Sequence, residues 1–445
     1  MLHFSRAAIV GGALLTALAP TLYGQTNRID AVTPLAPELA SYGPLAIGVR
    51  TLQVTNRNHP DVLGTKEGGP LARYDRTLTL EVWYPATLTT KTPRDGEYRG
   101  VITRDPSVVV TLQGRAVRDA APRPVGGGYP LVLISHGYPG DRYLLSHLAE
   151  NLAGKGYVVA SIGHKDSTYD DQKAFASTLY NRPFDQLFVL NEMDRLGRGD
   201  SGTFLSGLVD ASRSGIVGYS MGGYGVVNTI GGGFSKNVWN LPIAPPNGLL
   251  AERGADNPAY LKSMDPRIKA AIAIAPWGMQ QGVWDDAGLR AIKTPVLFVA
   301  GSADDVSGYE KGTRAIFQGA VHSDRYLLTF LGANHNAGAP IPAPAETYES
   351  REGRPPGFLH YADPVWDTTR MNNILDHFAT AYFGWLLKGE EDKRAYLDVV
   401  PNGKDGVYAV DKDGKATATH TYWKGFPRRA AVGLVLEHLS PVVQP

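Results

Sequence analysis

The sequence has 445 residues and no cysteine, which excludes disulfide bonds, thiol catalysis, iron–sulfur clusters and cysteine-bound zinc. A surplus of charge is also missing, because 44 lysines and arginines balance 43 aspartates and glutamates to a net charge of +1. A chain without a basic surplus is a poor candidate for nucleic-acid binding. The hydrophobic fraction of 43% is ordinary and indicates a folded globular protein rather than a disordered one.

Long apolar runs are missing from the chain except at its N-terminus, where residues 7–25 carry no charge. A short basic start, an apolar stretch and small residues behind it are typical of a signal peptide. We expect residues 1–24 to be a signal peptide that is cleaved before Gln25. The mature chain is then exported, to the periplasm or the medium, and has no stable membrane span. The alternative is an N-terminal membrane anchor, although two glycines and Pro20 make this segment a weak span.

Strand and helix patterns alternate through most of the chain. Polar residues 25–41 are expected to be a mobile lead-in to a domain that covers residues 42–398. From residue 130 onward, short apolar runs alternate with helical patterns, which predicts an α/β fold with a mainly parallel central sheet flanked by helices. An apolar helical face that ends at Gly389 predicts a long final helix. The apolar runs expected as buried strands are residues 131–134, 157–162, 216–219, 268–275, 295–300 and 326–330.

Two long segments and a tail interrupt or follow this alternation. Residues 231–266 begin with three glycines and continue with apolar residues among prolines, and residues 336–369 are rich in proline. A glycine hinge followed by apolar residues is typical of a lid. We therefore expect residues 231–266 to be a lid-like insert that partly covers a pocket. The alternative is that this insert packs on the outer helices. Residues 399–445 are expected to form a C-terminal extension with a hairpin whose turn lies at residues 411–414.

Residues 218–222 match the pattern G-x-S-x-G, with Ser220 at its centre. The pentapeptide alone is weak, because a chain rich in glycine contains it often by chance. Its context is stronger, since a buried strand ends at Tyr219 and a helical pattern follows. A strand, a sharp turn and a helix are what a nucleophile elbow requires. Ser220 is therefore a candidate nucleophile, and a glycine-rich strand end without chemistry is the alternative.

A serine hydroxyl needs a base, and the base needs a carboxylate to orient it. In folds with a nucleophile elbow, the order along the chain is serine, acid and histidine. Asp304 and Asp305 follow the strand expected at residues 295–300, and His335 follows the strand expected at residues 326–330. The order is therefore satisfied, and either aspartate fits as the acid.

Acyl transfer also needs hydrogen-bond donors for the oxyanion. One is the backbone N–H of Met221, directly after the candidate nucleophile. The second donor comes from the loop after an early strand, and the N–H of Tyr138 is the candidate there.

The motifs together resemble those of α/β-hydrolases of the dienelactone hydrolase, platelet-activating-factor acetylhydrolase and cutinase-like polyester hydrolase group. The resemblance covers about residues 43–335 and the final long helix. It rests on residues 82–86, the loop His136-Gly137-Tyr138, the elbow, the segment Ala275-Pro276-Trp277, Asp304 and His335.

This resemblance implies an α/β-hydrolase fold and assigns a role to each matching residue. Ser220 is the nucleophile, Asp304 the acid and His335 the base. Tyr138 and Met221 form the oxyanion hole, and Trp277 is a wall of the acyl site. The two inserts and the tail depart from the group at positions where substrates would be selected, so its substrates do not transfer to this chain.

The sequence thus predicts an exported serine hydrolase that cleaves small-molecule carboxylic esters through an acyl-enzyme, without a metal or cofactor. A serine peptidase or amidase on the same triad is the first alternative. A non-catalytic binding protein on a hydrolase fold is the second. The sequence leaves the acyl group, the alcohol and the oligomeric state open.

Overall fold

A computed structural model describes residues 27–89, 96–199, 202–349 and 357–442. The predicted signal peptide and its cleavage site lie outside the described residues. Within these ranges no helix has the length and apolarity needed to cross a membrane.

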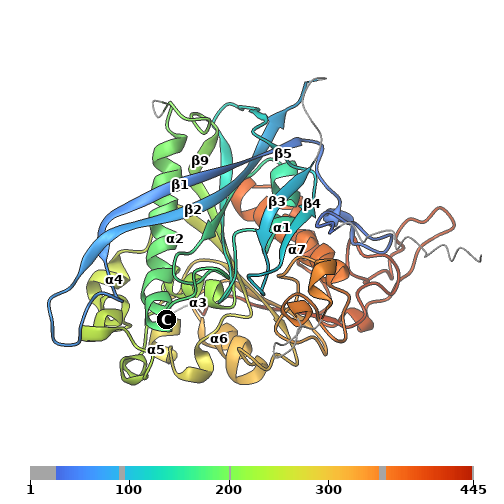
Figure 1. Cartoon of the computed structure of the whole chain (residues 1–445). Coiled ribbons are helices and arrows are strands. Elements are labelled where there is room, and N and C mark those ends of the chain that lie inside the picture. Colours follow the sequence, from blue (N-terminus) through green and yellow to red (C-terminus); the bar gives the residue numbers. More distant parts are fainter. Residues whose placement is uncertain (1–26, 90–95, 200–201, 350–356, 443–445) are drawn as a thin grey trace, which may run out of the picture.

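The described residues form one large mixed sheet with helices on both faces (Figure 1). The strands of this sheet, in spatial order, are β13 (Leu434–Leu439), β12 (Arg325–Phe330), β11 (Val296–Gly301), β10 (Ile268–Ile274), β9 (Val209–Tyr219), β7 (Tyr129–Ser135), β8 (Val158–Gly163), β2 (Arg73–Thr87), β1 (Ala46–Pro60) and β5 (Val117–Arg118), with β6 (Ala121–Pro122) paired to β2. Neighbours from β8 to β12 are parallel, whereas β1, β2 and β13 pair antiparallel to a neighbour. The predicted α/β fold with a mainly parallel sheet is therefore confirmed.

The central strands are continuous apolar runs because helices cover both of their faces. Along β7, Val132 and Ile134 face one core while Leu131 and Leu133 face the other. Helices α1 and α7 cover the first face, and α2 and α3 cover the second (Figure 1). The helices are α1 (Ser146–Gly154), α2 (Phe175–Gly197), α3 (Met221–Thr229), α4 (Pro258–Lys262), α5 (Asp286–Arg290), α6 (Arg314–Gly319) and α7 (Thr368–Lys388).

The segment before the domain is packed against it, which differs from the mobile lead-in expected at residues 25–41. Of its described part, Ile29 is buried and its N–H donates to the Gln113 carbonyl at 2.9 Å. Near its end, the Leu39 N–H donates to His377 Nδ1 of α7 at 3.1 Å. The expectation of mobility was wrong because this segment, although mostly polar, contains a few apolar residues that pack against the domain.

The insert at residues 231–266 packs on the outer helices, which is the alternative to the expected lid. Phe234 stacks on Tyr224 of α3 with ring centroids 5.3 Å apart. The Asn247 side chain bonds to the Gly68 N–H at 2.7 Å and to the Gly69 carbonyl at 3.0 Å, in the loop between β1 and β2. Phe234, Val238, Leu249 and Leu250 of this insert thus extend the core on the face of α2 and α3, whereas Ile243 is exposed.

The glycines that suggested a hinge are required by close packing instead. A Cβ on Gly232 would lie 2.7 Å from the Val227 carbonyl oxygen, and a Cβ on Gly233 would lie 2.5 Å from the Ala255 Cα. Real Cβ atoms essentially never approach backbone so closely, so only glycine fits at these two positions.

The tail contains a turn at residues 411–414 and adds a strand that the sequence analysis missed. Val410 and Ala416 form an antiparallel bridge around the turn at residues 411–414. Further on, β13 pairs with β12 from Leu434 opposite Phe330 to Leu439 opposite Arg325. The tail also contacts the segment that precedes the domain, because the Glu38 N–H donates to the Gly425 carbonyl at 2.8 Å. It contacts α7 as well, since the ring centroids of Phe426 and His377 lie 5.0 Å apart.

Candidate active site

Ser220 occupies a strained turn between β9 and α3. Its backbone angles are φ 53° and ψ −113°, a conformation that residues with a Cβ rarely adopt. The neighbouring strand β10 holds this turn, because the Ser220 N–H donates to the Ile274 carbonyl at 2.8 Å. The predicted strand–turn–helix is present, with the serine at its tip.

Glycine is needed on both sides of this serine. A Cβ on Gly218 would overlap the backbone of Gly222, and a Cβ on Gly222 would overlap the Ser135 carbonyl oxygen. The G-x-S-x-G spacing therefore follows from two close approaches, of Gly218 to the start of α3 and of Gly222 to the end of β7.

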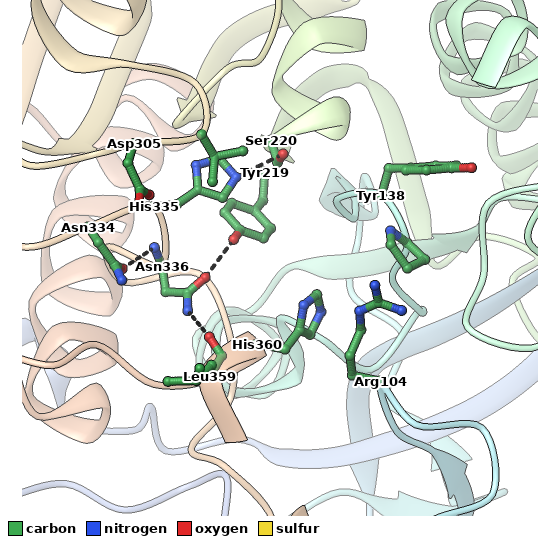
Figure 2. Close-up of a pocket in the computed structure, with 12 residues that line it drawn as sticks. Arg104, Tyr138, Tyr219, Ser220, Asp305, Asn334, His335, Asn336, Leu359 and His360 are labelled. Carbon is green, nitrogen blue, oxygen red and sulfur yellow. Dashed lines mark hydrogen bonds between the residues drawn. The ribbon is translucent and has the colours of Figure 1, made fainter. Parts of the chain in front are cut away.

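The structure brings Ser220, His335 and Asp304 together from three strand ends. Ser220 Oγ lies 3.0 Å from His335 Nε2 (Figure 2). His335 Nδ1 lies 3.1 Å and 3.0 Å from the two carboxylate oxygens of Asp304. Because an ionised carboxylate only accepts hydrogen bonds, Nδ1 carries the proton and Nε2 is the free base that accepts from the serine.

The surroundings of Asp304 keep it ionised. Burial raises the pKa of this carboxyl, but the bond from His335 and the N–H groups of Val306 and Ser307, each 2.9 Å from Oδ1, outweigh burial and hold the pKa below its ordinary value. Asp305 is exposed and does not contact the imidazole among the bonds of the described residues. Of the two aspartates left open by the sequence, only Asp304 is placed to orient His335.

The two N–H groups expected to bind an oxyanion lie next to this chain of bonds. Met221 is the first residue of α3, and Tyr138 follows the loop at the end of β7. Within the described part of the chain, neither N–H donates to a protein acceptor. Unpaired N–H groups of this kind are available to a developing negative charge.

A cavity of about 290 Å³ opens in front of Ser220 and His335 (Figure 2). Its lining residues come from the ends of β7, β9, β11 and β12, from the turn between β3 (Glu97–Ile102) and β4 (Val109–Gln113), and from the second insert, residues 336–369. They are Arg104, Tyr138, Pro139, Tyr219, Ser220, Asp305, Val306, Asn334, His335, Asn336, Leu359 and His360. Residues 336–369, rather than residues 231–266, therefore supply the insert that borders the site.

Trp277, expected as a wall of the acyl site, is not among the described residues that line this cavity. Its ring lies 5.2 Å from the Phe175 ring, which in turn lies 4.9 Å from the Tyr138 ring. The backbone N–H of Trp277 donates to the Ser220 carbonyl at 3.2 Å. Trp277 thus supports the elbow from behind and reaches the cavity only through Phe175 and Tyr138.

Asn336 is a site residue that the sequence analysis missed. Its Oδ1 accepts from the Tyr219 hydroxyl at 2.9 Å, and its Nδ2 donates to the carbonyls of Leu359 and Ala362 at 3.1 and 2.7 Å. It therefore ties the residue before Ser220 to the second insert (Figure 2). Its position directly after His335 was the only signal available in the sequence.

A buried polar network supports the loop that carries Tyr138. Arg182 of α2 donates to the carbonyls of His136 and Gly137 and, at 2.7 Å, to Ser167 Oγ. Burial, together with Arg182, keeps the pKa of His136 well below its ordinary value, so this ring is neutral. The backbone of the loop is thus fixed by a cation that lies behind it.

A second Ser–His–Asp series lies beneath this loop. His164 Nε2 is 2.8 Å from Ser135 Oγ, and His164 Nδ1 is 2.9 Å from Asp185. All three side chains are almost fully buried, and Asp185 is also paired with Arg76 at 2.8 Å. Because substrate cannot reach it, this series has a structural role.

Comparison with known proteins identifies relatives of parts of the chain. The model of the family "Platelet-activating factor acetylhydrolase, isoform II" matches residues 92–185, which include the Tyr138 loop but not Ser220, Asp304 or His335. Cutinase est2 of Thermobifida alba is 24% identical over 210 residues, which are 47% of this chain and 53% of that protein. Cutinase 2 of Thermobifida cellulosilytica is likewise 24% identical over 210 residues and 61% of its own length. The chain therefore spans little more than half the length of the curated relatives it matches.

Among solved structures, a ferulic acid esterase from Streptomyces cinnamoneus shares the fold. Its TM-score is 0.55 at 20% sequence identity, over 82% of this chain and 94% of that one. The chain therefore has an α/β-hydrolase fold, and over part of its length it is similar to cutinases and to the platelet-activating factor acetylhydrolase isoform II family.

Proposed function

We propose that the protein is a serine hydrolase that cleaves carboxylic esters through an acyl-enzyme intermediate. The observation that carries this proposal is the bonded series Ser220–His335–Asp304 at the tip of a strained elbow, open to a cavity. The cutinase and esterase relatives support ester substrates over amides. The alternative of a binding protein has no support from this geometry.

In the first half of the reaction, the Ser220 oxygen attacks the ester carbonyl carbon while His335 Nε2 takes the hydroxyl proton. Asp304 stabilises the imidazolium that results. The oxyanion of the tetrahedral intermediate accepts hydrogen bonds from the N–H groups of Met221 and Tyr138. When the intermediate collapses, the bond to the alcohol oxygen breaks, and His335 gives its proton to the leaving alcohol.

In the second half, a water molecule replaces the alcohol. His335 Nε2 takes a proton from this water, whose oxygen attacks the acyl carbon. The second tetrahedral intermediate uses the same two N–H groups. Its collapse releases the carboxylic acid and returns the proton from His335 to Ser220, so the enzyme is restored without a cofactor.

The test is the substitution Ser220→Ala, with Ser212→Ala on the exposed start of β9 as a control. We expect Ser220→Ala to lower turnover of an aryl ester by about 10⁴- to 10⁶-fold and to abolish labelling by a fluorophosphonate. The control should keep both. Turnover above a tenth of wild type in folded Ser220→Ala protein would refute the assignment. Faster cleavage of 4-nitroacetanilide than of 4-nitrophenyl acetate would favour an amidase.

We also propose that the protein is exported after removal of residues 1–24. The apolar, uncharged residues 7–25 behind a basic start support this proposal. N-terminal sequencing of the exported protein should begin near Gln25, whereas Met1 retained in a membrane fraction would favour the anchor.

A further inference from the structure

An arginine stands at the cavity on the side away from the strand ends. Arg104 belongs to the turn between β3 (Glu97–Ile102) and β4 (Val109–Gln113), a two-stranded sheet apart from the main one. The backbone N–H of Arg104 donates to the Tyr361 hydroxyl at 3.1 Å, and this bond fixes the turn to the second insert. Figure 2 shows its guanidinium group near His360, across the cavity from Ser220.

The Arg104 guanidinium has no ion pair or hydrogen bond within the described residues. The neighbouring carboxylate of Asp105 accepts from the N–H and hydroxyl of Ser107 at 3.1 and 2.8 Å. The other carboxylate at the cavity, Asp305, lies beside His335 on the opposite side (Figure 2). The two charges are therefore separated across the cavity, with the Arg104 guanidinium at one end and the Asp305 carboxylate at the other.

His360 does not add a second positive charge beside Arg104. Its Nε2 lies 2.8 Å from the Tyr169 hydroxyl. Burial, and after it the charges of Arg104 and His335, lower the pKa of His360 to about 3. The ring is neutral at neutral pH, so Arg104 is the one cationic group that faces this end of the cavity among the described lining residues.

We infer that Arg104 binds a carboxylate of the substrate, so that the preferred esters carry a second, ionised carboxyl group. This inference rests on the proposed ester hydrolysis. The planar guanidinium can donate two parallel N–H bonds to a carboxylate. A doubly charged phosphate would fit the same fork, but the described lining residues offer it no second cation. Asp305 repels the same carboxylate, so the substrate is oriented with its charge toward Arg104 and its ester toward Ser220.

The test compares two matched pairs of esters in wild type and variants. The first pair is 4-acetoxybenzoate and its neutral methyl ester, with the charge on the leaving group. The second is the 4-nitrophenyl monoester of adipic acid and its neutral methyl ester, with the charge on the acyl group. The readout is the ratio of kcat/KM for the charged ester to kcat/KM for the neutral one. Differences in intrinsic reactivity cancel when the ratio is compared between variants.

We expect Arg104→Gln to lower this ratio by about three- to fivefold in at least one pair, a modest range because the arginine is exposed. Arg104→Lys should restore part of the ratio, and Arg104→Glu should lower it further. Salt at 0.5 M should lower the wild-type ratio but not that of Arg104→Gln. The control Arg99→Gln removes an exposed arginine of the same hairpin that pairs with Glu97, and it should leave the ratio as in wild type.

Ratios that agree within twofold between wild type and Arg104→Gln in both pairs would overturn the inference. An equal loss on charged and neutral esters would also overturn it, because it would show a role in structure alone. If wild type cleaves no ester, the proposed function fails, and calorimetry of 4-acetoxybenzoate with Ser220→Ala still decides on Arg104. Binding that is weakened by adding Arg104→Gln supports the inference, and equal binding to both proteins rejects it.

Discussion

At the scale of single residues, the backbone of Ser220 stores strain that its neighbours hold in place. Its φ of 53° places the hydroxyl away from both β9 and α3, so that it faces His335 Nε2 at 3.0 Å. Such strain persists only where surrounding structure determines the conformation. Here the bond from the Ser220 N–H to Ile274 and the close approach of Gly222 to Ser135 do so.

The two aspartates after β11 allow a sharp test of the orienting role. We expect Asp304→Asn to lower kcat/KM for an aryl ester by about 10³- to 10⁴-fold, because an amide next to Nδ1 favours the wrong imidazole tautomer. Asp305→Asn should change it by less than about tenfold, since its exposed side chain does not touch the ring. Steady-state kinetics of both variants decide this, and a larger loss in Asp305→Asn would reverse the assignment.

The candidate site was partly predictable from the sequence, for a physical reason. Parallel strands place their carboxyl ends along one edge, so residues after three apolar runs meet there, as Ser220, Asp304 and His335 do. Arg104 could not be found in this way. It lies on a separate hairpin whose sequence reads as an ordinary turn, and only tertiary packing brings it to the cavity.

At the scale of elements, the insert at residues 231–266 shows that a run of glycines can mean tight packing rather than movement. The sequence alone cannot distinguish the two, because both require the absence of a Cβ. In the structure, Gly233 passes so close to Ala255 that no side chain fits between them. The buried side chains of Phe234, Leu249 and Leu250 hold the insert against the second core.

The substitution Gly233→Ala separates packing from hinge motion. Its Cβ would lie 2.5 Å from the Ala255 Cα, so we expect a loss of about 1–3 kcal/mol in the free energy of unfolding. Gly126→Ala is the control, because no atom lies within 4 Å of its Cβ, and it should change stability by less than about 0.5 kcal/mol. Urea unfolding measures both. If the two variants were equally stable, hinge motion rather than close packing would explain the glycines.

Predictions of whole elements succeeded where burial on both faces left a clear pattern. The expected strands at residues 131–134 and 326–330 match β7 and β12, because parallel strands between two helical layers are apolar throughout. Strand β13 escaped notice because only Leu434 and Leu436 of its six residues are deeply buried. An edge strand with one covered face gives too short a pattern to distinguish from a loop.

At the scale of the whole molecule, burial of ionisable groups ties stability to pH. Glu150 of α1 is fully buried and accepts bonds from the N–H groups of Arg115 and Ala116 at 2.9 Å and from the Tyr98 hydroxyl at 2.5 Å. Burial raises the pKa of Glu150 to about 7, and these bonds offset only part of that effect. The folded protein therefore keeps a proton here that the unfolded chain loses near its ordinary pKa of 4.5.

Between pH 4.5 and 7 the folded state binds more protons at this residue than the unfolded state. The contribution of Glu150 to the free energy of unfolding thus falls as pH rises, by at most about 1.4 kcal/mol per pH unit. We expect Glu150→Gln to remove this slope, and the exposed control Glu391→Gln to keep it. Urea unfolding at pH 5, 6 and 7 measures it. The same slope in Glu150→Gln and wild type would contradict this account.

The junction at His377 joins segments that lie far apart in the sequence. Leu39 and Phe426 both contact the same ring on α7. A variant without the segment around Phe426 would expose aromatic surface of α7 that this segment covers. The segments before and after the large sheet are therefore expected to depend on each other for their placement on α7.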